Sequence, residues 1–384
     1  MEKKVFRLNE ICRIKSGKRI PKGMDYVTYQ TNHPYIRARD IKSGNIITDD
    51  LIYIEDEVYK KIRKYIIQKG DIAITIVGSV GDTGYAKETV DGYNLTENAV
   101  RLTNFTEAVD SKFLHYVLMQ KHYYDYMQLI SGAAAQPKLG IYKIQKIRVV
   151  LPKVSVQKRI ANTLTTYDNL IENNNKRIKL LEQMAENLYK EWFVRFRFPR
   201  YEDVEFENGL PKEWEYTKLE GLANISTGKC NREDAEEDGA YPLFDRSQEI
   251  KRSNVWLKDC EAIIVPGEGT SFIPRYYNGK FNLHQRCYCV EPLEKGMGFF
   301  LYQTLMMYRI YFLYVATGAT VPSLRLNNFN DFKVLLPKKE LCFQYNEIAE
   351  KMNDEILLLK NKNELLAKQR NMLLPRLMSG KLVV

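Results

Sequence analysis

The side chains best suited to catalysis or metal binding are few in this sequence, and they form no recognisable set. The four histidines and six cysteines are scattered, and no Cys-x-x-Cys pair occurs. Cys287-x-Cys289 beside His284 has suitable residue types for a zinc site, but no second ligand pair with suitable spacing follows. Buried free thiols are the alternative, and they indicate a reducing cytosol. We therefore predict no catalytic residue and no metal ligand in this chain.

Motifs for nucleotide chemistry are also absent from the sequence. There is no Gly-x-x-x-x-Gly-Lys-[Ser/Thr] loop for ATP and no Asn/Asp-Pro-Pro-aromatic motif of amino-methyltransferases. Gly78-x-x-Gly81-x-x-Gly84 follows an apolar run, but it lacks the dinucleotide spacing and a lysine to meet a phosphate. We interpret this motif as a tight turn beside a strand, and we expect no cofactor in this chain.

The charge of the chain favours a polyanionic partner. The 384 residues include 58 Lys+Arg and 48 Asp+Glu, and residues 1–48 alone carry eleven basic and four acidic side chains. Lys and Arg set against phosphates release condensed counterions, so such a local surplus suits nucleic acid. Many basic proteins bind no nucleic acid, and charge alone leaves the partner open.

Membrane insertion and secretion are not expected. No uninterrupted apolar run approaches the roughly 20 residues needed to span a bilayer. The start, MEKKVFRLNE, lacks the apolar core of a signal peptide. We expect a cytoplasmic protein with no membrane contact.

An internal duplication organises the sequence. The matches are Ile14-Lys15-Ser16-Gly17-Lys18 with Ile225-Ser226-Thr227-Gly228-Lys229, Pro34 with Pro242, Ala73-Ile74 with Ala262-Ile263, Asn94-Leu95 with Asn282-Leu283, and Val149-Val150-Leu151-Pro152 with Val334-Leu335-Leu336-Pro337. The shift between copies falls from 211 to 185 residues and never rises, whereas chance matches would scatter in both directions. Its largest step, from 208 to 189, places about nineteen extra residues between Pro34 and Ala73.

Each copy has the pattern of a mixed α/β domain. It begins with short apolar runs broken by Gly, Asn and Asp, which predict strands and turns. A more helical stretch follows, and the copy closes on a strand that ends in Leu-Pro. We predict two similar α/β domains, at residues 1–152 and 201–337.

Two long helices are predicted after the two domains, at residues 153–200 and 338–384. Their apolar seams alternate by four and three residues, as in a coiled coil: Ile160, Leu164, Tyr167, Ile171, Asn174, Ile178, Leu181, Ala185, Leu188 and Trp192, then Ala349, Met352, Ile356, Leu359, Asn363, Leu366, Arg370, Leu373 and Leu377. Asn174 and Asn363 either fix the register of a closed seam or lie where the seam is open. We expect the helices to form an antiparallel intramolecular coiled coil that holds the domains apart; separate packing of each helix on its own domain, or dimerisation, is the alternative.

Three phrases of the sequence then point to one family. They are ENLYKEWFVRFRFP at 186–199, GLPKEW at 209–214 and LLPRLMSGKL at 373–382. With the order of domain, helix, domain and helix, they make the whole chain resemble the specificity subunits of type I restriction–modification complexes.

The resemblance implies a division of labour. Each domain would be a target-recognition domain that reads one half of a bipartite, asymmetric DNA site. The helices would set the spacing and dock two methyltransferase subunits, with restriction subunits (translocase and nuclease) joining outside. S-adenosylmethionine, ATP and Mg would then belong to the partner subunits, and this chain would catalyse nothing.

Recognition of double-stranded DNA needs side chains that reach base edges, and arginine suits guanine while Asn and Gln suit adenine. The candidates in the first domain are Lys18, Arg19, Arg37, Arg39, Lys42, Ser79, Gln136 and Lys138. Those in the second domain are Lys229, Arg246, Ser247, Gln248, Thr270, Gln285, Ser323 and Arg325. For each of them, a solvated surface role is the alternative. The second domain also carries an acidic run, NREDAEED at 231–238, which either turns away from DNA or faces a partner subunit.

Three other functions remain open at this point. A bipartite DNA-binding regulator would need only DNA, and an interaction scaffold would carry its positive charge incidentally. An enzyme is disfavoured by the missing motifs. Adjacent genes for a methyltransferase and a helicase–nuclease would decide among these functions.

Overall fold

The computed structural model describes residues 3–132, 137–318, 320–379 and 381–382. They fold into two compact units, and the chain leaves the first unit and later returns to it. The first unit combines Met1–Asn173 with Asn363–Val384, and the second is Asn174–Lys362. The predicted domain boundaries at residues 152, 200 and 337 rest on sequence pattern and stay predictions.

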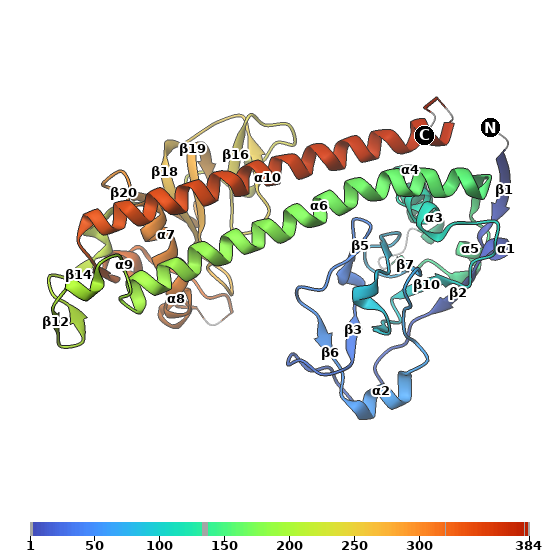
Figure 1. The fold of residues 1–384 in the computed structure, drawn as a ribbon, viewed down its shortest axis with the longest axis horizontal. Coiled ribbons are helices and arrows are strands. Elements are labelled where there is room, and N and C mark those ends of the chain that lie inside the picture. Colours follow the sequence, from blue (N-terminus) through green and yellow to red (C-terminus); the bar gives the residue numbers. More distant parts are fainter. Residues whose placement is uncertain (1–2, 133–136, 319, 380, 383–384) are drawn as a thin grey trace. The chain divides into compact units, whose positions relative to one another are not determined.

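The first unit is a mixed α/β fold (Figure 1). Its strands are β1 (Lys3–Arg7), β2 (Arg13–Ser16), β3 (Pro34–Ile36), β4 (Ile41–Lys42), β5 (Asn45–Ile46), β6 (Ile52–Tyr53), β7 (Ile72–Thr75), β8 (Thr83–Tyr85), β9 (Asn94–Leu95), β10 (Ala99–Thr103) and β11 (Arg148–Pro152). Its short helices are α1 (Leu8–Ile11), α2 (Asp56–Ile62), α3 (Ser111–Leu118), α4 (Lys121–Ser131) and α5 (Ile141–Gln145). The main sheet has the order β2-β10-β7-β8, and apolar residues of β7, β10 and α3 share one buried core.

The second unit has the same kind of fold. Its strands are β12 (Phe206–Glu207), β13 (Leu210–Pro211), β14 (Glu215–Lys218), β15 (Ala223–Thr227), β16 (Tyr241–Phe244), β17 (Lys251–Ser253), β18 (Lys258–Pro266), β19 (Arg275–Leu283), β20 (Cys287–Pro292) and β21 (Lys333–Leu336). Its short helices are α7 (Gly298–Met307), α8 (Arg309–Val315) and α9 (Leu326–Asn330). The sheet order β15-β20-β18-β19-β16-β17 joins in one sheet what the first unit divides between two.

Strand register shows that the two units share one framework. The parallel pair β3–β9 aligns Tyr35 with Asn94, and the parallel pair β16–β19 aligns Leu243 with Asn282. These pairs are related by the predicted shifts of 208 and 188 residues. The predicted duplication and the mixed α/β class are confirmed.

One glycine in each unit lies where two backbone segments approach closely. A Cβ atom on Gly17 would lie 2.0 Å from the carbonyl oxygen of Thr96, and one on Gly228 would lie 2.0 Å from that of Leu283. Backbone atoms cannot move aside as a flexible side chain can. Glycine is therefore required at both positions by the same approach of the chain.

The register also corrects one of the sequence matches. Ile74 pairs with Val100 in the first unit, and Val265 pairs with Tyr288 in the second. Val100 and Tyr288 are equivalent by the shift of 188 residues, so Ile74 corresponds to Val265 at a shift of 191. The predicted match with Ile263, at 189, is wrong by two residues, and the insert in the first copy is seventeen residues rather than nineteen. It contains α2.

The two predicted long helices are α6 (Val154–Tyr189) and α10 (Lys339–Ser379), and each contributes to both units. In the second unit, Ile178 shares a cluster with Ile356 and Leu359, whereas further along α6 the carbonyl of Ala185 accepts a hydrogen bond from Tyr345. Rising residue numbers on α6 meet falling numbers on α10, so the helices are antiparallel there.

The same helices pair in the first unit. Leu374 and Leu377 of α10 belong to one buried core with Ile160 and Leu164 of α6. Asn174, which lies on the second unit's part of α6, is buried, so the open-seam explanation does not hold for it. A register-fixing role for this residue stays a prediction.

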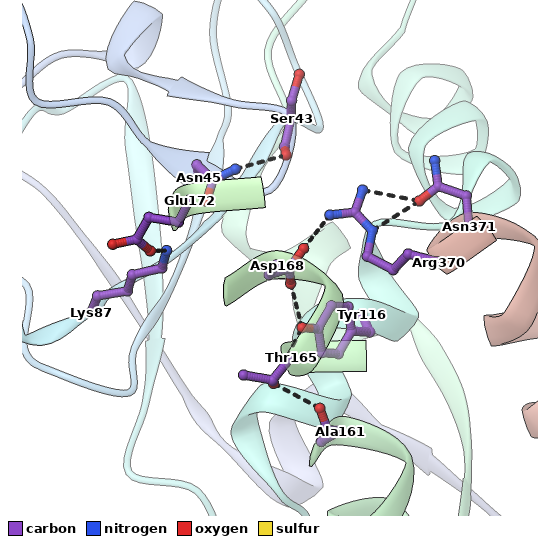
Figure 2. A network of polar contacts seen from close by, with 10 residues as sticks. All are labelled: Ser43, Asn45, Lys87, Tyr116, Ala161, Thr165, Asp168, Glu172, Arg370 and Asn371. Carbon is purple, nitrogen blue, oxygen red and sulfur yellow. Dashed lines mark hydrogen bonds and ion pairs between the residues drawn. The ribbon is translucent and has the colours of Figure 1, made fainter. Parts of the chain in front are cut away.

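Arg370, a charged residue on the apolar seam of α10, is explained by its contacts in the first unit. Figure 2 shows Asp168 of α6 between Tyr116 of α3 and Arg370 of α10, and it bonds to both side chains. Arg370 also donates two hydrogen bonds to Asn371, at 3.0 and 3.2 Å. Burial is the main cause that raises the pKa of Tyr116, so its hydroxyl remains a donor to the carboxylate.

Two smaller predictions can also be compared with the structure. Gly78 and Gly81 have φ angles of +84° and +89° in the turn between β7 and β8, which agrees with the predicted tight turn beside a strand; the absence of a nucleotide site there stays a prediction. Each predicted helical stretch is two helices, α3 with α4 and α7 with α8. No helix among the described residues is long and apolar enough to cross a membrane.

Candidate nucleic-acid interface

In the second unit, residues from several loops meet beyond the ends of the strands. The backbone N–H of Lys229, after β15, donates to the carbonyl of Leu283 at the end of β19, at 3.0 Å. Gln285 donates to the side chain of Asn231 at 2.6 Å, which places the start of the acidic run beside a predicted recognition residue. Ser323 forms an isolated bridge with Glu268, after β18. Lys229 and Gln285 thus lie close together after β15 and β19, and Ser323 lies beside Glu268.

Glu268 organises the basic side chains of this region. Arg246 lies 2.6 Å from Oε2 of its carboxylate, and Arg286 lies 2.8 Å from Oε1. The Glu268 side chain is 17% exposed, whereas the arginine side chains are 46% and 54% exposed. Sequence reasoning found Arg246 but missed Glu268 and Arg286, because no local pattern marks them.

The loop that carries Arg246 is fixed by hydrogen bonds from Arg275. The Arg275 guanidinium donates to the carbonyls of Asp245 and Ser247, at 2.6 and 2.8 Å, and lies 5.0 Å from the Phe244 ring. Burial by itself raises the pKa of Asp245, but Lys251 and Ser247 outweigh it, and the pKa falls to about 2. This carboxylate stays charged and accepts two hydrogen bonds from Ser247.

The first unit places other side chains on the same framework. Lys18, after β2, donates its backbone N–H to Leu95 at 2.8 Å, and its carbonyl accepts a hydrogen bond from Tyr35 at 2.9 Å. Arg19 is exposed, and its nearest carboxylate, Glu97, is 3.8 Å away. Lys138 is exposed and forms an isolated bridge with Val77. The side chains of Lys18, Arg19 and Lys138 are therefore less firmly fixed than those of Arg246 and Arg286 around Glu268.

The two arginines after β3 have carboxylate partners. Arg37 is mostly buried and donates to both oxygens of Asp40, at 2.9 and 2.8 Å. Arg39 is exposed and lies 2.8 Å from Asp50. Arg37 therefore stabilises its own loop, and Arg39 is the more accessible of the two.

The other candidates occupy the surface. Exposed residues are Lys42, Ser79, Ser247, Gln248, Thr270 and Arg325. Gln136 lies outside the described residues. DNA contact stays a prediction for all sixteen positions.

The family follows from a sequence comparison. The family model described as "Type I restriction modification DNA specificity domain" matches residues 1–183 and 211–369. These ranges cover both copies of the duplication and most of both long helices.

The chain belongs to the type I restriction–modification DNA specificity family.

Specificity subunits of known organisms are similar to this chain. The chain is 24% identical over 357 residues to the MjaIX specificity subunit of Methanocaldococcus jannaschii. The aligned region covers 86% of this chain and 82% of that protein. It is 34% identical over 144 residues to the EcoDI specificity subunit of Escherichia coli, over 38% of this chain and 31% of that protein. The crystal structure of a type I S subunit from M. genitalium has a TM-score of 0.60 at 16% identity, over 98% of this chain and 96% of that one, and supports the fold.

One trio of side chains in this specificity subunit has metal-binding residue types. The ligand atoms of Cys260, Cys289 and Glu291 all lie within 4.8 Å of one another. These are not the residues weighed from the sequence, Cys287 and His284 beside Cys289, for which no metal site was predicted; Cys260 lies on β18, and Cys289 and Glu291 lie on β20. The Lys258 ammonium lies 2.9 Å from Glu291 and already balances its charge, so we assign no metal role to this trio.

Proposed function

We propose that this specificity subunit reads a bipartite, asymmetric DNA site, one half with each unit, and contributes no catalytic group itself. The observation that carries the proposal is the pair of loop clusters on one framework. In the second unit, Arg246 and Arg286 converge on Glu268; in the first, Lys18 and Arg19 follow β2, the strand equivalent to the one that precedes Lys229. A shared framework with different exposed side chains suits two different base sequences.

The catalytic steps then belong to partner subunits. We propose two methyltransferase subunits that bind S-adenosylmethionine, and restriction subunits that use ATP and Mg. The sequence of this chain lacks the ATP and amino-methyltransferase motifs, which supports that division. Its six cysteines are free thiols, which suits the cytoplasm as its compartment.

The long helices are proposed to set the gap between the half-sites. Both α6 and α10 continue as helices through the boundary between the two units, at 173/174 and 362/363. A continuous helix transmits length more faithfully than a flexible linker does.

Methylome sequencing of the host tests both parts of this proposal. With the gene present, we expect methylated adenines in a motif of two specified halves and an unspecified gap, and the motif should disappear when the gene is deleted. Inserting seven residues into each helix, after Asn173 and after Lys362, preserves the heptad phase and adds about 10 Å at roughly 1.5 Å per residue. The gap should lengthen by about three base pairs at roughly 3.4 Å each.

A matched control and two contrary outcomes complete the design. Seven residues inserted after Gly209, between β12 and β13, should leave the gap unchanged. If the methylated motif remained after deletion of the gene, this result would contradict DNA recognition by this chain. An unchanged gap with both helix insertions, and methylation intact, would contradict the spacer role alone.

A further inference from the structure

The carboxylate of Glu268 divides its two oxygens between two arginines that come from different loops. Nη1 of Arg246, after β16, is 2.6 Å from Oε2, and Nη1 of Arg286, after β19, is 2.8 Å from Oε1. Each arginine therefore uses one nitrogen and one carboxylate oxygen. The mostly buried position of Glu268 makes this shared contact a fixed anchor rather than a surface ion pair.

Most of the donor capacity of the two arginines remains available. A guanidinium has five N–H donors in one plane, and the contact with Glu268 uses only Nη1. Within the part of the chain that the structure describes, the Nε and Nη2 groups of Arg246 and Arg286 make no hydrogen bond. About half of each side chain is exposed, at 46% and 54%.

These free donors fit one base better than the others. Guanine presents two acceptors, N7 and O6, in the major groove, and two N–H groups of one arginine can bond to both. Adenine presents an acceptor and a donor there, and arginine has no acceptor for the donor. Two positive charges against one negative charge also leave the cluster attractive to a polyanion.

Resting on the proposed function, we propose that the second unit recognises a half-site that contains G·C pairs, with guanines read by Arg246 and Arg286. Glu268 is the positioning residue that orients both guanidinium groups before DNA arrives. Fixing a side chain in advance removes an entropic cost of ordering it on binding. In the first unit the arginines after β3, the strand equivalent to β16, also have carboxylate partners, but only 19% of the Arg37 side chain is exposed, so the inference is confined to the second half-site.

The full-length chain can be tested on a pool of random DNA duplexes, by sequencing the duplexes it retains. The wild-type protein should enrich a motif with two halves. Arg246→Ala and Arg286→Ala should each reduce discrimination at a G·C position of the same half, roughly ten- to hundredfold, and leave the other half intact. Arg246→Lys keeps the charge but not the planar fork, so it should retain nonspecific affinity and lose the G·C preference.

The variant Glu268→Gln separates positioning from general stability. It should reduce discrimination at both arginine-dependent positions, by roughly three- to tenfold, because the guanidinium groups are no longer fixed. Its affinity for nonspecific duplex should be equal or higher, since a negative charge near the phosphates is removed. Glu207→Gln, at an exposed carboxylate of β12 in the same unit, is the charge-matched control and should leave the motif unchanged.

Each contrary result has a separate meaning. Arginine-dependent positions that are A·T pairs would overturn the guanine assignment while leaving DNA recognition in place. Equal weakening on all sequences would make the arginines phosphate contacts and overturn the inference. A Glu268→Gln protein with the motif of the Glu207→Gln control would overturn the positioning role. A wild-type protein that enriches no motif would overturn the proposed function and this inference together.

Discussion

Arg101 in β10 and Cys289 in β20 occupy the same register position in the two units, opposite Ala73 and Ile264. In the first unit Arg101 donates to Asp71 at 2.8 Å, and both side chains are buried. In the second unit the thiol of Cys289 lies beside Cys260, and Ala262 stands at the position of Asp71. The two sheets therefore keep one backbone arrangement around an ion pair in one case and thiols in the other.

The two units therefore share the register of their strands but differ in the side chains buried between them. Helix α3 adds another difference, because it buries His115, whereas α7 contains no histidine. Changes at shared backbone positions should affect both units alike, and changes at the differing positions should affect only one. Three experiments test this expectation, from the largest effect to the smallest.

The largest effect is expected at the shared glycines. Gly17→Ala and Gly228→Ala would each place a Cβ atom 2.0 Å from a backbone carbonyl oxygen, and neither segment can yield easily. Each change should cost more than about 4 kcal/mol in its own unit. Hydrogen exchange measured by mass spectrometry should show lost protection in β2 and β10 for the first variant and in β15 and β20 for the second. If only one of the two variants lost protection in its own unit, the two glycines would not be equivalent.

A smaller and one-sided effect is expected at the buried ion pair. Asp71→Ala leaves Arg101 buried without its carboxylate and should cost about 3–5 kcal/mol in the first unit. The double variant Asp71→Ala with Arg101→Cys copies the residues of the second unit, Ala262 and Cys289, and should recover most of that loss. Chemical unfolding followed by hydrogen exchange of β7 and β10 measures both. A double variant no more stable than Asp71→Ala would show that the two interiors are not interchangeable.

The smallest effect depends on pH and concerns His115. Burial lowers its pKa from 6.5 to about 4, so the unfolded chain takes up a proton first as the pH falls. The stability that depends on the neutral ring is complete above about pH 6.5 and declines toward pH 4, by about 2 kcal/mol at pH 5. His115→Gln removes the titrating group, so exchange protection of α3 should change less between pH 7 and pH 5 than in the wild-type protein. The same change in both proteins would assign the acid sensitivity to other groups. Protection of α7 serves as the internal control.

Much of the architecture could be predicted from sequence because it depends on repeating local patterns. The heptads of α6 and α10 and the matching phrases of the two copies extend over many residues, so single exceptions such as Arg370 do not hide them. The match of Ala73-Ile74 was wrong by two residues for a related reason. Side chains in a strand alternate with a period of two, so an error of two keeps every residue on its own face.

The recognition cluster was harder to predict because it depends on contacts between distant loops. Glu268 and Arg286 are eighteen positions apart, and their approach requires the register of β18 with β20. Arg37 was predicted for its charge alone, yet its contacts with Asp40 give it a structural role that sequence spacing does not reveal. Sequence supplied the residue types, and the fold determined which of them meet.

The composition of the first unit also determines when its core residues become available during synthesis on the ribosome. Its core includes Leu374 and Leu377 of α10, packed with Ile160 and Leu164 of α6. Residues 174–362, which make the second unit, all emerge before Leu374 does. The unit that is translated first is therefore completed last, and its apolar helix face remains uncovered while its neighbour is synthesised. The last core residues of the first unit therefore become available only after the whole of the second unit has been synthesised.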